Sequence, residues 1–175
     1  DEDGRGGGLF LINSNFGMDS SIVDNNSSND GGGGFYIYNS NAIIRNAVIS
    51  NNYSGDSGGG GFYIYNSNAI ISNNVVFDNG GQSGGAFKIK NSDVEMGNLL
   101  IDNNSATWSG GALLIDDSNL NINNSTIINN ISGAPTWYGP AIRIYNDYQN
   151  IIFNNVTISD NFDVFVGNTE NNLII

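Results

Sequence analysis

The chain repeats its own sequence about every 26 residues, and this period limits the fold more than any other feature. The stretch GGGGFYIYNSNAII occurs twice, starting at Gly31 and at Gly58. Looser copies begin at Gly6, Gly84, Gly110 and Gly139. Each copy is followed by an apolar residue, two spacers and an asparagine, and these asparagines are Asn26, Asn52, Asn79, Asn104, Asn130 and Asn161. Such a period indicates a stack of similar structural units.

Each unit has the alternating pattern of short β-strands. In GGAFKIK, the apolar Phe87 and Ile89 alternate with Lys88 and Lys90. Three such runs fit in one repeat, for example Ala112–Asp116, Leu120–Ile122 and Thr126–Ile128. Gly, Asn, Asp and Ser separate the runs, and these residues favour turns. A unit of this size cannot bury its apolar face alone, whereas stacked units can, because each strand pairs with its counterpart in the next unit.

These features predict an all-β fold, a right-handed parallel β-helix of about seven coils with three short strands per coil. Right-handedness follows from the general handedness of parallel crossover connections. The β-helix fills residues 1–175 as a single domain, and we expect neither end to be capped. Two interpretations stay open: a piece of a longer chain, or a subunit whose coils stack head to tail into a fibre.

Asparagine at the same turn of every coil favours a ladder, in which each side-chain amide bonds the amides above and below it. We expect the asparagines that close each repeat to form such a structural ladder. A second column of the same kind contains Asn13, Asn39, Asn66, Asn91, Asp117 and Asn146.

The signatures GGA-Φ and Φ-x-x-N, once per coil, resemble the repeat of polymorphic outer-membrane proteins, within the pectate-lyase-like β-helix superfamily. The resemblance covers nearly the whole chain. The copies at Gly6, Gly31 and Gly58 depart from it by having Gly where Ala is usual, and Gly139-Pro140 breaks the double glycine. The resemblance implies a secreted or surface-exposed region, often adhesive, and transfers no catalytic residue to this chain.

One strip of the predicted coil collects unusual residues. The outward positions of the first strand include Tyr36, Tyr38, Tyr63, Tyr65, Lys88, Lys90, Asp116, Arg143 and Tyr145, and the turn before this strand carries Trp108, Trp137 and Tyr138. Three of the five Lys and Arg thus lie on one strip of a chain whose net charge is −12. Aromatic faces stack on sugar rings, and cations bind carboxylates or sulfates, so the strip favours an extended acidic glycan. It is equally typical of a contact face in a larger assembly.

The composition limits what this strip can do. Without His or Cys, the chain lacks the residues of an ordinary zinc site, a Ser–His–Asp triad or a disulfide framework. The 17 Asp and Glu against 5 Lys and Arg disfavour binding to nucleic acid. Eliminative cleavage of a uronate polymer needs a base, which only Lys or Arg could supply on the strip. Structural calcium is the only cofactor alternative, at Asp1, Glu2, Asp3, Asp30 or Asp56.

The sequence therefore predicts a non-enzymatic β-helix, extracellular or at the cell surface, with a structural or adhesive role. Its expected partners are copies of itself, head to tail or side by side, or a surface glycan. The alternative is a carbohydrate-binding or polysaccharide-lyase module that acts on an acidic glycan at the first strand. No apolar run approaches the roughly 18 residues of a membrane-spanning helix.

Overall fold

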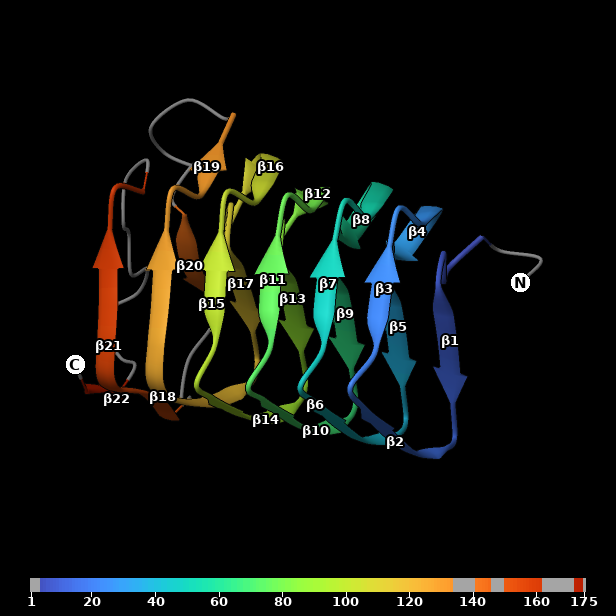
Figure 1. Ribbon diagram of the computed structural model, residues 1–175, viewed down its shortest axis with the longest axis horizontal. Helices are drawn as coiled ribbons and strands as arrows, with labels where there is room; N and C mark the ends of the chain where they lie inside the picture. The colour runs from blue at the N-terminus through green and yellow to red at the C-terminus, as the bar shows by residue number, and fades with distance from the viewer. Residues whose placement is uncertain (1–3, 134–140, 146–149, 162–171, 175) are drawn as a thin grey trace.

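The computed structural model describes residues 4–133, 141–145, 150–161 and 172–174. All regular elements in these residues are β-strands, and every described strand pair is parallel. Figure 1 shows the coils following one another along the long axis, from β1 (Leu9–Ile12) at one end to β21 (Asn150–Ser159) at the other. The predicted all-β parallel solenoid is confirmed.

The strands form three sheets, each built from equivalent segments of successive coils. The first sheet contains β1, β5 (Phe35–Tyr38), β9 (Phe62–Tyr65), β13 (Phe87–Lys90), β17 (Leu113–Asp116) and β20 (Ile142–Tyr145). The second contains β2 (Asn15–Asp19), β6 (Asn41–Arg45), β10 (Asn68–Ser72), β14 (Asp93–Gly97), β3 (Ile22–Asp24), β7 (Val48–Ser50), β11 (Val75–Phe77), β15 (Leu100–Asp102), β18 (Asn119–Ile128), β21 and β22 (Asn172–Ile174). The third contains β4 (Ser27–Gly32), β8 (Tyr53–Gly59), β12 (Gly80–Ser83), β16 (Ser105–Ser109) and β19 (Ile131–Ser132).

The three sheets do not match the three predicted runs one for one. The second and third runs of each repeat share the second sheet, and in β18 they form one continuous strand. The third sheet comes from the segment that the sequence indicated as a turn. The first sheet takes one strand from each coil, and its six strands delimit five turns. The solenoid therefore has about five turns rather than the predicted seven. Residues 162–171, which follow the last asparagine of the repeat, lie outside the described residues.

The core is built from the inward positions of the strands. Phe35, Phe62 and Phe87 are fully buried and stack face to face on successive coils. Their ring centroids are 4.7 and 4.6 Å apart, and each pair of ring planes is inclined by only 4°. This separation matches the distance of about 4.8 Å between neighbouring strands. The strand register therefore places each ring on its counterpart in the next coil.

The asparagines that close each repeat form the predicted ladder. Each side-chain Nδ2 donates to Oδ1 of the next asparagine at 2.9–3.0 Å, from Asn26 through Asn52, Asn79, Asn104 and Asn130 to Asn161. The backbone N–H of each donor residue bonds the same oxygen, as Asn52 does with Asn79 at 3.0 Å. Nδ2 of Asn79 also donates to the carbonyl of Ile49 one coil back, at 2.9 Å. The ladder thus satisfies polar groups in the interior of the solenoid.

The second predicted column is a feature of the backbone. Asn13, Asn39, Asn66, Asn91 and Asp117 have φ between +47° and +49°, the left-handed conformation that Asn and Asp tolerate, and their side chains are exposed. Asn146 lies outside the described residues. The serines that follow make the hydrogen bonds between coils: Oγ of Ser40 accepts from the N–H of Ser14, and Oγ of Ser67 from that of Ser40, at 3.0 Å each. The expected second amide ladder is thus a serine ladder.

The double glycine is required because neighbouring coils approach closely at the end of the third sheet. A Cβ added at Gly85 would lie 2.2 Å from the carbonyl oxygen of Gly111 and 2.5 Å from that of Ser105. A Cβ added at Gly111 would lie 2.2 Å from the carbonyl oxygen of Ile131. No side chain fits in this space at Gly85 or Gly111.

Candidate functional site

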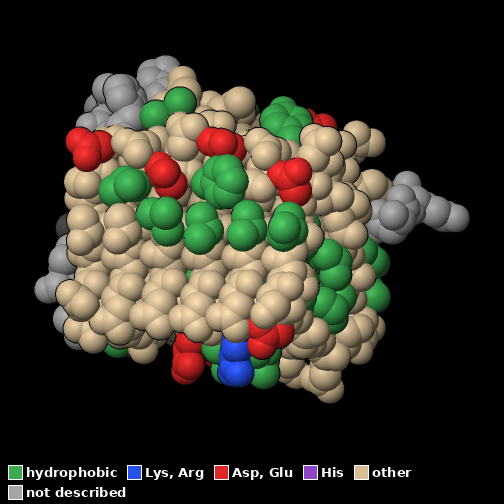
Figure 2. Space-filling view, in the orientation of Figure 1, with side chains coloured by type: hydrophobic (Ala, Val, Ile, Leu, Met, Phe, Trp, Pro, Cys, Tyr) green, Lys and Arg blue, Asp and Glu red, His purple; other side chains and the backbone are tan. Residues whose placement is uncertain are grey.

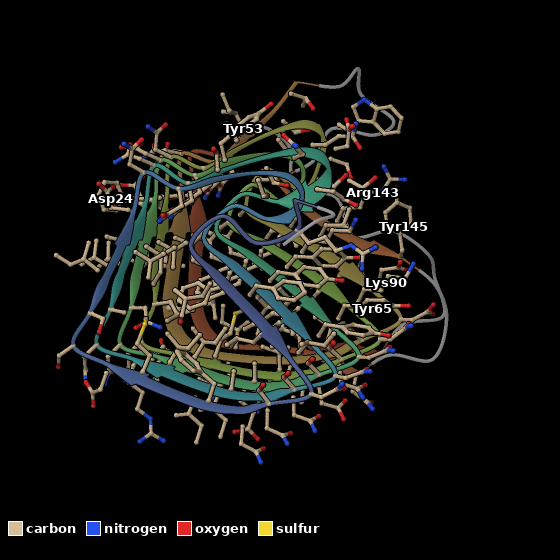
Figure 3. All side chains as sticks on the ribbon, turned by 90° about the vertical axis from the view of Figure 1, so that its right-hand side faces the viewer. Asp24, Tyr53, Tyr65, Lys90, Arg143 and Tyr145 are labelled. Carbon is tan, nitrogen blue, oxygen red and sulfur yellow. The ribbon has the colours of Figure 1, made fainter. Side chains whose placement is uncertain are left out.

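The first sheet brings the predicted strip together in two straight rows. Tyr36, Tyr63, Lys88, Leu114 and Arg143 are in register on successive strands and form one row. Tyr38, Tyr65, Lys90, Asp116 and Tyr145 form the other. Figure 3 shows Tyr65, Lys90, Arg143 and Tyr145 on one side of the coil, with Asp24 on the opposite side. The strip thus divides into a tyrosine half near the N-terminal end and a charged half after it.

In the tyrosine half, the rings pack against one another. Tyr36 is only 5% exposed and stacks on Phe10, with the ring centroids 5.4 Å apart. The Tyr36 and Tyr63 rings pack in a T-shaped arrangement with their centroids 5.3 Å apart. The ring centroids of Tyr38 and Tyr65 are also 5.3 Å apart. Burial raises the pKa values of the Tyr36 and Tyr63 hydroxyls. The partly exposed rings of Tyr38, Tyr63 and Tyr65 are the ones that reach the surface.

In the charged half, Lys88 lies between an aromatic ring and a backbone carbonyl. Its Nζ is 4.6 Å from the centroid of the Tyr63 ring and donates a hydrogen bond to the carbonyl oxygen of Ser57. Burial, and next the neighbouring charge of Lys90, lower the pKa of the Lys88 ammonium. Lys90 forms an ion pair with Asp116 across the strands, with Nζ and Oδ2 3.1 Å apart.

A pocket opens between this charged half and the third sheet. It encloses about 210 Å³ and is lined by Ser83, Lys88, Lys90, Trp108, Ser109, Leu114, Asp116, Arg143 and Tyr145. The indole of Trp108 is 63% exposed at its wall. Cζ of Arg143 lies 4.0 Å from the centroid of the Tyr145 ring, so the guanidinium covers this ring. One small hollow therefore collects three cations, of which Lys90 is paired with Asp116, and the surfaces of Trp108 and Tyr145.

The face of the solenoid opposite the pocket differs from it in charge. Figure 2 shows acidic side chains at several places on the face toward the viewer, and Lys or Arg only at its lower edge. The whole chain has 5 Lys and Arg against 17 Asp and Glu. The pocket is thus a local concentration of positive charge on an acidic protein, which favours an anionic ligand at this place.

The structure groups most of the predicted site residues but not all of them. Trp137 and Tyr138 lie outside the described residues. Ser83 and Ser109 were not among the predicted site residues, although they are in register on β12 and β16 and line the pocket. Each of these serines directly precedes a double glycine, and this repeated position was the available signal.

The acidic residues considered for calcium are only partly described. Asp30 and Asp56 are in register on β4 and β8, and Oδ1 of Asp30 accepts from the N–H of Gly31 at 2.8 Å. Asp1, Glu2 and Asp3 lie outside the described residues. In the part of the chain that the structure describes, no group of three or more His, Cys, Asp or Glu is placed to hold a metal ion.

Comparison with known proteins concerns the whole solenoid. The family model described as the right-handed beta helix region matches residues 7–175. This match agrees with the predicted handedness and supports the pectate-lyase-like superfamily. Comparison with curated proteins and with solved structures gives no match. Within the described residues, no helix is long and apolar enough to cross a membrane.

Proposed function

The chain belongs to the right-handed β-helix family, and we propose that it is a binding module that holds an acidic glycan in the pocket between β13, β16 and β20. One observation carries this proposal. The register of the first sheet gathers Lys88, Lys90 and Arg143 in one hollow, beside the exposed indole of Trp108.

The lining of the pocket provides the contacts that an acidic sugar needs. The exposed face of Trp108 offers a surface on which a sugar ring stacks. Lys88, Lys90 and Arg143 supply positive charge toward a carboxylate or sulfate. The hydroxyls of Ser83 and Ser109 add short hydrogen-bonding groups on the opposite wall. Because the strip continues past Lys88 to Tyr63, an extended ligand would pass from the charged half toward the tyrosine rings.

We place this module outside the cell, in an adhesive or structural role. The support for this proposal is the GGA-Φ and Φ-x-x-N repeat, which resembles that of polymorphic outer-membrane proteins. A stiff stack of coils holds its binding residues at fixed spacing, which suits adhesion to a repetitive polymer. Association of copies, predicted from the sequence, stays a prediction that static light scattering of the isolated chain would test.

Eliminative cleavage of an acidic glycan is a second candidate function. The observation that favours it is the lowered pKa of Lys88, because a neutral amine is needed to accept a proton. In this reaction Lys88 would take the proton from the carbon next to the uronate carboxylate. The glycosidic C–O bond on the adjacent carbon would then break, leaving a C=C bond in the sugar ring, and the leaving oxygen would take a proton from solvent water.

A glycan array with matched acidic and neutral oligosaccharides tests the proposed function. We expect binding to uronate or sulfated sugars, and its loss in Trp108→Ala. Tyr53→Ala is the matched control, because Tyr53 is a 52% exposed aromatic residue of the same sheet that does not line the pocket. Equal loss in both variants, or equal binding of neutral sugars, would overturn the proposal. Appearance of an unsaturated uronate product would instead support the second candidate.

A further inference from the structure

A second hollow lies on the outer face of the second sheet, away from the cationic pocket. It encloses about 560 Å³ and crosses β6, β10, β14, β18 and β21. This part of the second sheet runs along the bottom of the coil in Figure 3, with its outer side chains pointing to solvent. We call this hollow the lower groove.

The floor of the lower groove is apolar on β6 and β10 and acidic on its middle strand, β14. Ile43, Ile70, Glu95, Asn121 and Ile152 are in register on its five strands. Ile43 and Ile70 are 41% and 38% exposed, although both are large aliphatic side chains. The carboxylate of Glu95 follows directly on the next strand and is exposed.

The acidic middle of this floor carries uncompensated negative charge. Glu95 has no hydrogen bond or ion pair within the part of the chain that the structure describes. Asp93, two residues before it on the same face, accepts a hydrogen bond from Nδ2 of Asn119 at 2.7 Å, which leaves its charge in place. Arg45 is the cation on this face, and it lies in register with Asp19.

The rim of the lower groove is a row of exposed amides. Nδ2 of Asn41 donates to Oδ1 of Asn15 at 2.9 Å, and Nδ2 of Asn68 donates to Oδ1 of Asn41 at 3.2 Å. These bonds hold the amides in line along the groove edge. The described lining residues include no aromatic side chain, in contrast to the cationic pocket. The lower groove therefore lacks the stacking surface that a sugar ring favours.

We propose that the lower groove docks an extended peptide segment of another protein, with aliphatic side chains on Ile43 and Ile70 and a lysine at Glu95. Charge complementarity selects this occupant, because Glu95 and Asp93 face solvent beside an apolar floor. The length of the lower groove agrees with that of a short extended peptide. Five strands span about 19 Å at roughly 4.8 Å per step, and an extended chain of about six residues covers the same length.

Titration of the ¹⁵N-labelled full chain with the hexapeptide acetyl-TLTLTK-amide, followed by NMR, tests this proposal. We expect shift changes confined to the strands that line the lower groove, β6, β10, β14, β18 and β21, and no binding of the twin peptide that has Glu in place of Lys. Glu95→Gln should weaken binding about two- to fivefold, the range of an exposed ion pair. Ile70→Asn should remove binding while the remaining spectrum shows a folded chain.

Asp56→Asn is the matched control, because it removes the same charge from an exposed position on β8. It should leave the affinity unchanged. Four results would overturn the proposal: no binding, equal binding of the Lys and Glu peptides, shift changes at the cationic pocket, or equal weakening by Asp56→Asn and Glu95→Gln.

Discussion

The backbone N–H and the side-chain Nδ2 of Asn52 both donate to Oδ1 of Asn79, one coil away, at 3.0 Å each. Both residues are buried, so this single oxygen satisfies two interior donors. The same arrangement recurs between Asn79 and Asn104, and it links the coils through their side chains as well as their backbones. Interior polar groups that are fully paired in this way hold the register of a stack.

Asn79→Ala should destabilise the solenoid. The substitution removes three interior hydrogen bonds: those from the backbone N–H and from one Nδ2 hydrogen of Asn52 to Oδ1 of Asn79, and that from Nδ2 of Asn79 to the carbonyl of Ile49. Each buried unsatisfied group costs about 1–3 kcal/mol, so we expect a loss of at least about 3 kcal/mol in the free energy of unfolding. Urea unfolding followed by circular dichroism measures this loss. Asn68→Ala is the control, because the side-chain hydrogen bond from Asn68 to Asn41 is exposed. This substitution should change the free energy of unfolding by about 0.5 kcal/mol or less.

Gly85→Ala should be poorly tolerated, whereas Gly97→Ala should be neutral or stabilising. The added Cβ at Gly85 meets backbone oxygens of the next coil, and backbone cannot move aside cheaply. At Gly97 no atom lies within 4 Å of the added Cβ, and alanine reduces the freedom of the unfolded chain, worth about 0.4–1 kcal/mol. Thermal melting of the two variants compares them directly. Equal melting temperatures would contradict the close approach of the coils at Gly85.

The affinity for an acidic glycan should depend on pH through Lys88. Only the protonated ammonium attracts a carboxylate, and burial lowers its pKa below the ordinary 10.5. Binding should therefore be strongest well below this lowered pKa and weaken as the pH rises through it. Lys88→Arg keeps its charge throughout and should bind without this decline. Calorimetry across a pH series tests the difference, and identical profiles of the two proteins would remove Lys88 from the site.

Much of the architecture could be predicted because the repeat itself encodes the register. The duplicated GGGGFYIYNSNAII places Phe35 on Phe62 and Tyr36 on Tyr63, and the structure pairs them so. The buried amide ladder followed from asparagine at one position of every coil. The third sheet was missed because its glycine- and serine-rich strands, such as β4 and β12, carry no alternating apolar pattern.

The two candidate sites were harder to predict from the sequence than the fold. The strip residues could be assigned to one face from their positions in the repeat. The pocket, however, forms because Trp108 on the third sheet and Lys88 on the first line the same hollow. The lower groove was also missed, because Ile43 and Ile70 resemble core residues in sequence and only their outward direction distinguishes them. Strand periodicity assigns faces within a run, whereas a hollow depends on how neighbouring side chains fill space.

Isothermal titration of the chain with an oligogalacturonate, for the wild type and for Lys88→Gln, tests the glycan-binding proposal most directly. We expect the wild type to bind and Lys88→Gln to lose about tenfold in affinity, the effect of removing a hydrogen bond to a charged group. Arg45→Gln removes a cation from another face and should bind like the wild type. No binding by the wild type, or the same loss in both variants, would contradict the account.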